Sequence, residues 1–178
     1  MDIYEPREDS FLLEKWVKKL ARGRCLDVGT GSGIQAQAAL KKAREVMGVD
    51  INPAAVAQCR KSIPKAKFYV SDLFSYFDEQ KDKRKFDTII FNAPYLPAEG
   101  EKDAALDGGK EGHEIIARFL RESKHYLSKG GQILLIFSSL TKKEEVDKQI
   151  KKNKMKSEEL EKIHVFFEDI FCYRVTWN

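Results

Sequence analysis

Short apolar runs alternate along the chain with longer segments in which apolar residues recur every three or four positions. Continuous apolar runs are typical of strands buried on both faces of a parallel sheet, and the wider spacing is typical of helices. Strands are expected at residues 24–28, 45–50, 67–72, 86–91 and 132–138. Helices are expected at about residues 6–21 and 34–44, from Asn52 onward, and at about 111–128 and 141–152.

The last part of the chain predicts two further strands, at residues 157–166 and 169–177. Too few residues separate them for a crossover helix, so they are expected to pair antiparallel. Strands that alternate with helices predict an α/β fold, here a doubly wound sheet of seven strands covered on both faces. We expect residues 1–178 to form a single domain, because the length is too short for two. The charged segment 78–85 is expected to be a surface loop, and the long polar segment 98–112 a functional loop.

Composition and charge argue against several classes of protein. Cys25, Cys59 and Cys172 are far apart and have no His nearby, which argues against a zinc site and against a disulfide framework. We therefore expect no metal, and free thiols in a reducing cytoplasm. No apolar stretch approaches the roughly 18 residues of a membrane span, and the N-terminus lacks a signal-peptide pattern. A net charge of +4 permits contact with nucleic acid but does not require it.

A glycine-rich segment, Asp27-Val-Gly-Thr-Gly-Ser-Gly33, follows the first expected strand. Gly29 and Gly31 allow a tight turn from strand to helix in which the backbone approaches a ligand closely. A nicotinamide dinucleotide fingerprint would need glycine where Ile34 stands, and the Asp27 carboxylate would repel a pyrophosphate. The same carboxylate suits a cationic ligand.

Three carboxylates follow or end the first three strands, at the edge where open α/β sheets bind their ligands. Asp27 precedes the glycines, and Asp50 can accept two hydrogen bonds from ribose hydroxyls. Asp72 can pair with an adenine amino group while Leu73 packs on the ring. Each acid alone is more often a helix cap than a ligand. Together with the glycine-rich turn they indicate S-adenosylmethionine, which carries an ammonium and a sulfonium group and no phosphate.

The fourth strand ends in Asn92-Ala93-Pro94-Tyr95, a pattern that suits methyl transfer onto a planar nitrogen. The lone pair of an amide or aromatic amine nitrogen is delocalised, so an enzyme must hold it toward the methyl group. The Asn92 side-chain oxygen and the Ala93 carbonyl can each accept one N–H of the acceptor group, and Tyr95 can stack on its plane. By itself the tetrapeptide is as easily a turn after a strand.

Five blocks of the sequence together resemble the HemK-type protein glutamine methyltransferases, and most closely their archaeal and eukaryotic release-factor branch. These blocks are residues 4–13, 27–33, 50–53, 92–95 and 108–112. The glycine-rich block is common to all class I methyltransferases, whereas the first and last blocks narrow the resemblance to this branch. The resemblance implies a class I methyltransferase sheet in the strand order 3-2-1-4-5-7-6, with the last strand antiparallel.

The resemblance also implies methyl transfer from S-adenosylmethionine to the glutamine of the Gly-Gly-Gln loop of a class I translation release factor. By resemblance and position, the cofactor contacts would be Ser10, Asp27, Gly29, Gly31, Asp50, Asp72, Leu73 and Asn92. Asn92 would also bind the substrate amide, with Ala93, Pro94 and Tyr95 completing the catalytic segment. The family has proline where this chain has Ala93, so we expect the stiffness of the segment to rest on Pro94 alone.

Some members of this branch act with a small zinc-binding activator protein. In the implied strand order the third strand, around residues 67–70, lies at an edge of the sheet and exposes unpaired backbone groups. Such a partner could add a strand there. Equally, Lys65 and Lys67 could simply protect a free edge from pairing.

Three alternatives stay open at this point. The exocyclic amine of adenine or guanine would suit Asn92 as a carboxamide does, and the lysine-rich residues 148–156 keep RNA or DNA open as a substrate. Against it, no target-recognition domain is evident. A deprotonated protein lysine is a second alternative substrate, and a cofactor-binding scaffold without activity is the third. The intact Asn92 and Tyr95 argue against the scaffold, and we expect a cytoplasmic enzyme that requires neither membrane nor nucleic acid.

Overall fold

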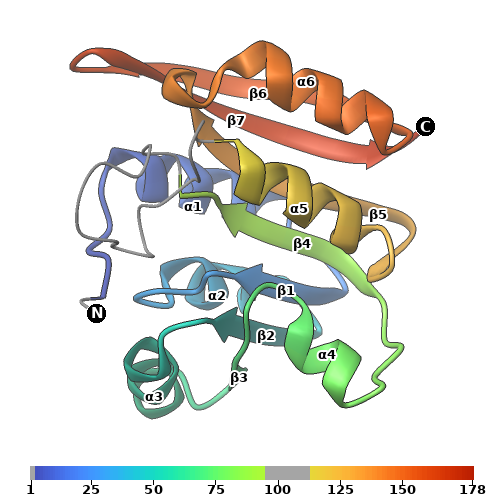
Figure 1. The fold of residues 1–178 in the computed structure, drawn as a ribbon. Coiled ribbons are helices and arrows are strands. Elements are labelled where there is room, and N and C mark those ends of the chain that lie inside the picture. Colours follow the sequence, from blue (N-terminus) through green and yellow to red (C-terminus); the bar gives the residue numbers. More distant parts are fainter. Residues whose placement is uncertain (1–2, 95–112) are drawn as a thin grey trace.

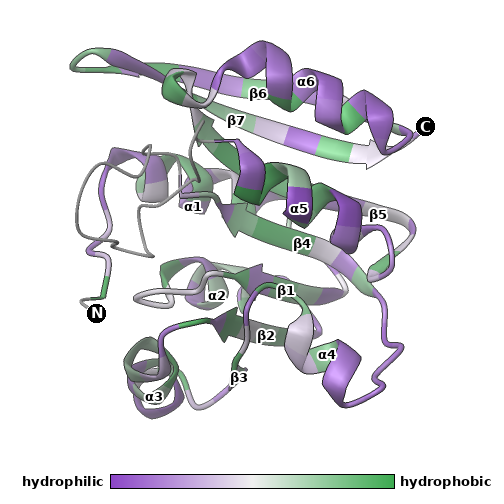
Figure 2. Ribbon diagram, in the orientation of Figure 1, coloured by the Kyte–Doolittle hydropathy of each residue, from purple (hydrophilic) through white to green (hydrophobic). Residues whose placement is uncertain are grey.

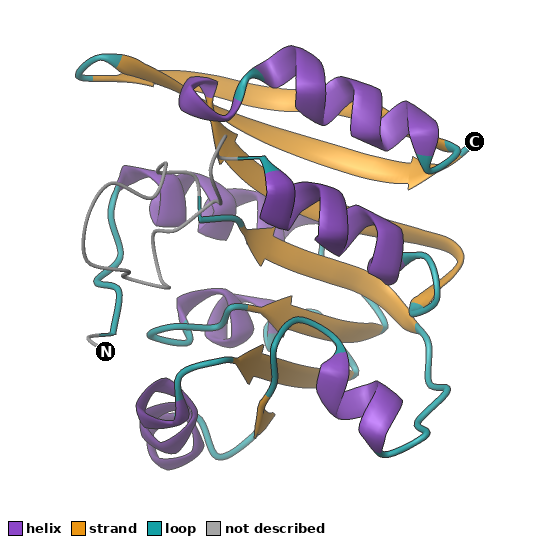
Figure 3. Ribbon diagram, viewed as in Figure 1, coloured by secondary structure: helices purple, strands orange, loops and turns teal. Residues whose placement is uncertain are grey.

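The computed structural model describes residues 3–94 and 113–178, and these residues form one seven-stranded mixed sheet (Figures 1 and 3). The strand order is β3-β2-β1-β4-β5-β7-β6. The strands are β1 Arg24–Val28, β2 Glu45–Asp50, β3 Lys67–Val70, β4 Phe86–Asn92, β5 Leu127–Ser138, β6 Met155–Val165 and β7 Glu168–Trp177. Strands β1 to β5 pair in parallel, whereas β7 runs antiparallel to both β5 and β6. The expected strand order and antiparallel last strand are confirmed.

Helices cover both faces of the sheet, as expected for a doubly wound fold (Figure 1). They are α1 Glu8–Leu20, α2 Ile34–Ala39, α3 Pro53–Ser62, α4 Ser75–Glu79, α5 Glu114–Ser123 and α6 Lys143–Lys152, with a 3-10 turn at Ser139–Thr141. Leu13 and Val17 of α1 belong to the core that α1, α2 and α3 form with one face. Phe77 and Phe119 belong to the core under α4, α5 and α6. The strands between the two cores are accordingly hydrophobic, and α6 is mostly hydrophilic (Figure 2).

Two expectations about element boundaries are wrong. The segment expected as a loop from residue 78 overlaps α4, a helix of five residues that is too short to show a helical repeat and that buries Phe77. Strand β5 begins at Leu127 rather than at residue 132, and α5 ends at Ser123. The pairing of β4 with β5 jumps at this point, and the intervening residues, which include Gly130 and Gly131, form an irregularity that interrupts the apolar pattern.

The outer strands of the sheet are β3 and β6, so the expected edge position of β3 is confirmed. The polar segment 98–112 and the block 108–112 lie outside the described residues. Within residues 3–94 and 113–178, no helix is long and apolar enough to cross a membrane.

Candidate active site

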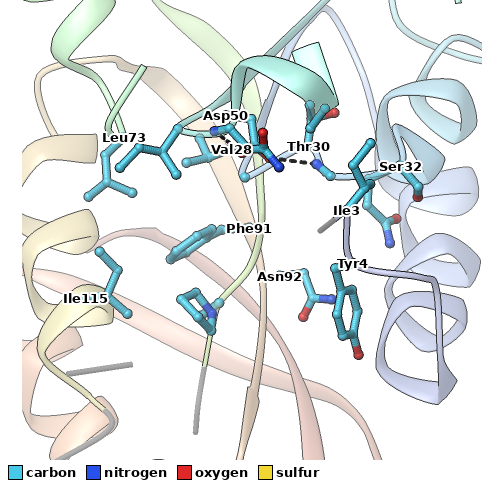
Figure 4. Close-up of a pocket in the computed structure, with 18 of the residues that line it drawn as sticks. Ile3, Tyr4, Val28, Thr30, Ser32, Asp50, Leu73, Phe91, Asn92 and Ile115 are labelled. Carbon is cyan, nitrogen blue, oxygen red and sulfur yellow. Dashed lines mark hydrogen bonds between the residues drawn. The ribbon is translucent and has the colours of Figure 1, made fainter. Parts of the chain in front are cut away.

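A cavity of about 330 Å³ lies at the carboxyl ends of β1 to β4 (Figure 4). Parallel strands bring these ends to one edge of the sheet, so residues distant in sequence meet there. Figure 4 places Leu73, Phe91 and Ile115 on one side of the cavity and Asn92 with Tyr4 on the other. The cavity therefore has an apolar wall and a polar wall.

The glycine-rich turn after β1 forms one end of this cavity. Gly29 and Gly31 have φ angles of 65° and 51°, which strain any residue with a side chain, and both line the cavity. The Gly31 N–H donates to Asp50 Oδ2 at 2.8 Å, and the Asn52 N–H donates to Asp50 Oδ1 at 2.8 Å. Asp50 also lines the cavity, so the turn and the end of β2 hold its carboxylate in a fixed position.

Asp27 lies behind the turn and not among the residues that line the cavity. Its Oδ2 accepts hydrogen bonds from Thr30 Oγ1 at 2.7 Å and from the Ala36 N–H at 3.1 Å. Burial raises the pKa of this carboxyl from 3.8 to about 7. Asp27 therefore ties the turn to α2, and a direct contact with a ligand stays a prediction.

Asp72 and Leu73, which follow β3, both line the cavity. The Asp72 carboxylate accepts a hydrogen bond from Arg118 Nη1 of α5 at 2.8 Å and a second one from Arg118 Nη2. Arg118, which no motif indicated, also lines the cavity. Leu73 has a φ of 48° and is 7% exposed, so its side chain packs with Phe91 and Ile115 on the apolar side.

Asn92, at the end of β4, is oriented by a residue that the sequence patterns did not single out. Its Nδ2 donates to Asp9 Oδ2 at 2.9 Å and lies 3.4 Å from Ser10 Oγ. A carboxylate can only accept hydrogen bonds, so the Asn92 NH2 group, and not its oxygen, must face Asp9. The Asp9 Oδ1 is held in turn by the Ser10 N–H at 2.6 Å, and Tyr4 OH lies 3.2 Å from both carboxylate oxygens.

Two buried acceptors in this cavity have no hydrogen-bond partner among the described residues, Asn92 Oδ1 and Gln35 Oε1. The Gln35 Nε2 donates to the Ser10 carbonyl at 2.8 Å, while its Oε1 is buried. A buried acceptor without a partner is costly unless a ligand supplies a donor. The polar side of the cavity is therefore suited to N–H donors. Within the described residues, no group of His, Cys, Asp and Glu side chains is placed to hold a metal ion.

The expectation that Pro94 alone stiffens the segment after β4 is wrong. The Ala93 N–H donates to the Ile136 carbonyl of β5 at 3.2 Å, and Ala93 is 2% exposed. Ala93 is thus an extension of the sheet, a role that sequence spacing does not reveal. Ala93 and Pro94 line the cavity, whereas Tyr95 lies outside the described residues.

Comparison with known proteins assigns the chain to a family. The family described as "Methyltransferase small domain" matches residues 8–166. The chain belongs to this family. A Methanocaldococcus jannaschii protein, provisionally named a protein N5-glutamine methyltransferase, is 39% identical over 180 residues, which cover 95% of this chain and 89% of the relative. Methyltransferase HEMK2 of Mus musculus is 32% identical over 167 residues, which cover 84% and 78%. Within its family the chain is thus a HemK-type protein methyltransferase.

A solved structure shares the fold over the whole chain. A chain of the E. cuniculi Mtq2-Trm112 complex superposes with a TM-score of 0.82 at 23% identity, and the match covers 100% of both chains. At this level of identity the likeness shows the fold alone.

Proposed function

We propose that this methyltransferase transfers the methyl group of S-adenosylmethionine to the side-chain amide nitrogen of a glutamine in the Gly-Gly-Gln loop of a class I translation release factor. The observation that carries the proposal is Asn92 Oδ1, a buried acceptor that Asp9 orients and that lacks a partner among the described residues. The names of the relatives support glutamine as the acceptor. The E. cuniculi complex is described as responsible for the methylation of the eRF1 translation termination factor, which supports the release factor.

S-adenosylmethionine fits the groups that line the cavity. Asp50, held by two N–H donors, keeps lone pairs for the ribose hydroxyls, and Leu73, Phe91 and Ile115 offer an apolar wall for adenine. The spare Gln35 oxygen suits an ammonium group. We further propose that Ser10, Gly29, Gly31 and Asp72 border the cofactor, and that Asp27 acts through the turn it supports. When bound, the cofactor supplies a methyl group made electrophilic by its sulfonium.

The residues after β4 position the acceptor for this transfer. Asn92 Oδ1 accepts one N–H of the glutamine amide and the Ala93 carbonyl accepts the other, which fixes the plane of the amide. The nitrogen lone pair is perpendicular to that plane, so fixing the plane directs the lone pair at a methyl group held against one face of the amide. Tyr95 is the proposed stacking partner. The methylated nitrogen is cationic and acidic, so water takes its proton and no side chain needs to act as a base.

The test compares three acceptors with labelled S-adenosylmethionine: a purified release factor, the same factor with its Gly-Gly-Gln glutamine changed to alanine, and RNA. We expect label on the first only. Asn92→Ala should lower kcat by at least about a hundredfold while changing cofactor affinity by less than about threefold. Label on RNA alone would overturn the proposed substrate, and equal loss of catalysis and cofactor binding would overturn the role of Asn92.

One surface feature weighs against nucleic acid as the substrate. The lysine-rich residues 148–156 lie at the end of α6 and the start of β6. Met155, the first residue of β6, pairs with Trp177, and the adjacent Thr176 pairs with Gln132 in the amino-terminal half of β5. The start of β6 therefore lies at the amino-terminal end of β5. These lysines are therefore at the edge of the sheet opposite the cavity, where a base held near Asn92 could not contact them.

We also propose that residues 1–178 form one methyltransferase domain and that a small activator subunit adds a strand at β3. Val70 of β3 is 48% exposed, and the Mtq2 structure contains Trm112 as a second protein. Two contacts within the chain compete with the pairing of a partner strand at β3. Lys67 Nζ lies 3.6 Å from Glu45 Oε1, and Arg60 Nε donates a hydrogen bond to the Phe68 carbonyl. Co-purification of a small protein with the wild type and its loss from Val70→Lys would support the partner, whereas full activity of the isolated monomer would count against it. Zinc binding by that partner and the cytoplasmic location stay predictions.

A further inference from the structure

Two aromatic residues form the turn between β6 and β7. Phe166 is 84% exposed and Phe167 is 99% exposed, more than any other large apolar side chain among the described residues. The hairpin tip that carries them is hydrophobic in Figure 2, although the strands behind it are largely polar on their outer side.

The turn is also an unfavourable place for these residues. Val165 pairs with Glu168, so the hairpin has a two-residue loop, and Phe166 has a φ of 53°. Phe167 does not have a positive φ, so only the first loop residue is in the left-handed region, and Gly is preferred at that position because it adopts positive φ with little strain. The two phenylalanines therefore stabilise the fold neither through their backbone conformation nor through burial of their side chains. Two such side chains on one tip point to a binding surface.

A second cavity, of about 430 Å³, lies beside the tip and is lined by Phe166, by Val165 and Ile170 and by Phe11 of α1. Phe11 is itself 55% exposed. Asp9 lines both this cavity and the reaction cavity, so the two lie on either side of this residue. A chain segment in the second cavity would lie next to a group held by Asn92.

The tip projects on the side of the sheet where the reaction cavity opens. Strand β7 starts at Glu168, and Ile170 pairs with Ser138, the last residue of β5. The turn therefore extends past the carboxyl end of β5, beside the start of α1 (Figure 1). The edge proposed for an activator, β3, is at the opposite end of the sheet.

The charges around the second cavity indicate the chemistry of its occupant. Glu8 and Glu168 outnumber Arg7 among its lining residues, whereas the Asp9 carboxylate is buried and already bonded to Asn92 and Ser10. We propose that the surface formed by Phe11, Phe166 and Phe167 binds the methyl-accepting protein through an apolar segment near the acceptor residue, and that a basic side chain of that segment faces the two glutamates. This inference rests on the proposed protein substrate.

The test uses the full chain, purified release factor, and a short acceptor peptide that carries only the Gly-Gly-Gln sequence and its immediate neighbours. Phe166→Gly combined with Phe167→Asn places glycine at the position with positive φ, so the variant should fold at least as well as the wild type. Its kcat/KM for the release factor should fall at least tenfold through KM, because the two aromatic rings are no longer buried on binding. Phe167→Leu, which keeps an apolar side chain, is the matched control and should lose less than about threefold.

The outcomes separate the two proposals. Methylation of the short peptide should be the same for the wild type and the double variant, since the peptide lacks the apolar segment proposed to bind the second cavity. Unchanged kcat/KM of the double variant for the release factor, or an equal loss with the peptide, would overturn the docking surface and leave the proposed function in place. If the wild type methylates neither acceptor, the proposed function fails and the docking surface with it. If the Phe tip instead mediates self-association, the wild type alone should sediment as a dimer, which would also overturn the proposal.

Discussion

Asp9→Asn is a nearly isosteric change that should reverse the polarity of Asn92. In the wild type, Asp9 Oδ1 accepts from the Ser10 N–H and Asp9 Oδ2 accepts from Asn92 Nδ2. The Ser10 N–H would hold the single oxygen of an asparagine at the Oδ1 position. Its NH2 group would then face Asn92 Nδ2, donor against donor. The Asn92 amide relieves this clash by rotating half a turn, which places its own NH2 group in the cavity.

The magnitude follows from the bond that is lost. In the rotated state the acceptor amide meets a donor where it needs the Asn92 oxygen, and a buried polar group left unpaired costs roughly 1–3 kcal/mol. We therefore expect kcat to fall by about 10- to 100-fold. Asp9 does not line the apolar wall proposed for adenine, so cofactor affinity should change by less than about threefold.

The assay is steady-state methyl transfer to release factor at saturating cofactor, with calorimetric titration of cofactor into each variant. Because Asp9 acts through Asn92, the double variant with Asn92→Ala should be no slower than Asn92→Ala alone. Unchanged kcat in Asp9→Asn would refute this reasoning. So would independent, multiplicative losses in the double variant.

Three further changes test other parts of the site. Ala93→Pro should keep the activity, because the carbonyl at this position remains. It should lower the free energy of unfolding by about 1 kcal/mol, since it removes the N–H that donates to the Ile136 carbonyl. An inactive variant with native circular dichroism would contradict this expectation. Asp27 has a pKa of about 7 in the folded protein and 3.8 as its ordinary value, so its burial costs nothing below about pH 4 and up to roughly 4 kcal/mol above pH 7. Asp27→Asn should therefore gain stability relative to the wild type as pH rises from 4 to 7 in urea titrations, and a difference independent of pH would be inconsistent with that pKa. Asp50→Asn should weaken cofactor binding about 10- to 100-fold in calorimetry with a smaller effect on kcat at saturation, and a variant that binds normally would exclude a ribose contact.

Much of the fold could be predicted because it rests on local patterns. Continuous apolar runs predict the strands, and because Asp50 and Asn92 stand at strand ends, the sequence places them at one edge of the sheet. Elements without a repeat could not be predicted in this way. Helix α4 has five residues, and the irregular start of β5 around Gly130 depends on pairing with β4.

The partners of the site residues were the least predictable part. The bond between Asp9 and Asn92 joins residues 83 positions apart, and only the packing of α1 beside β4 brings them together. Asp9 precedes Ser10 within the N-terminal block, and an acidic residue beside a proposed ligand residue is the signal that could identify it from sequence. The ion pair of Arg118 with Asp72 joins α5 to the end of β3 and left no motif at all.

The most direct test of the account is to map the methyl group after this enzyme has acted on a release factor, by tandem mass spectrometry of the digested product. The account predicts one added methyl group on the side-chain nitrogen of the Gly-Gly-Gln glutamine, absent when Asn92→Ala replaces the wild type. A methyl group on a lysine, or on any residue outside that loop, would contradict it.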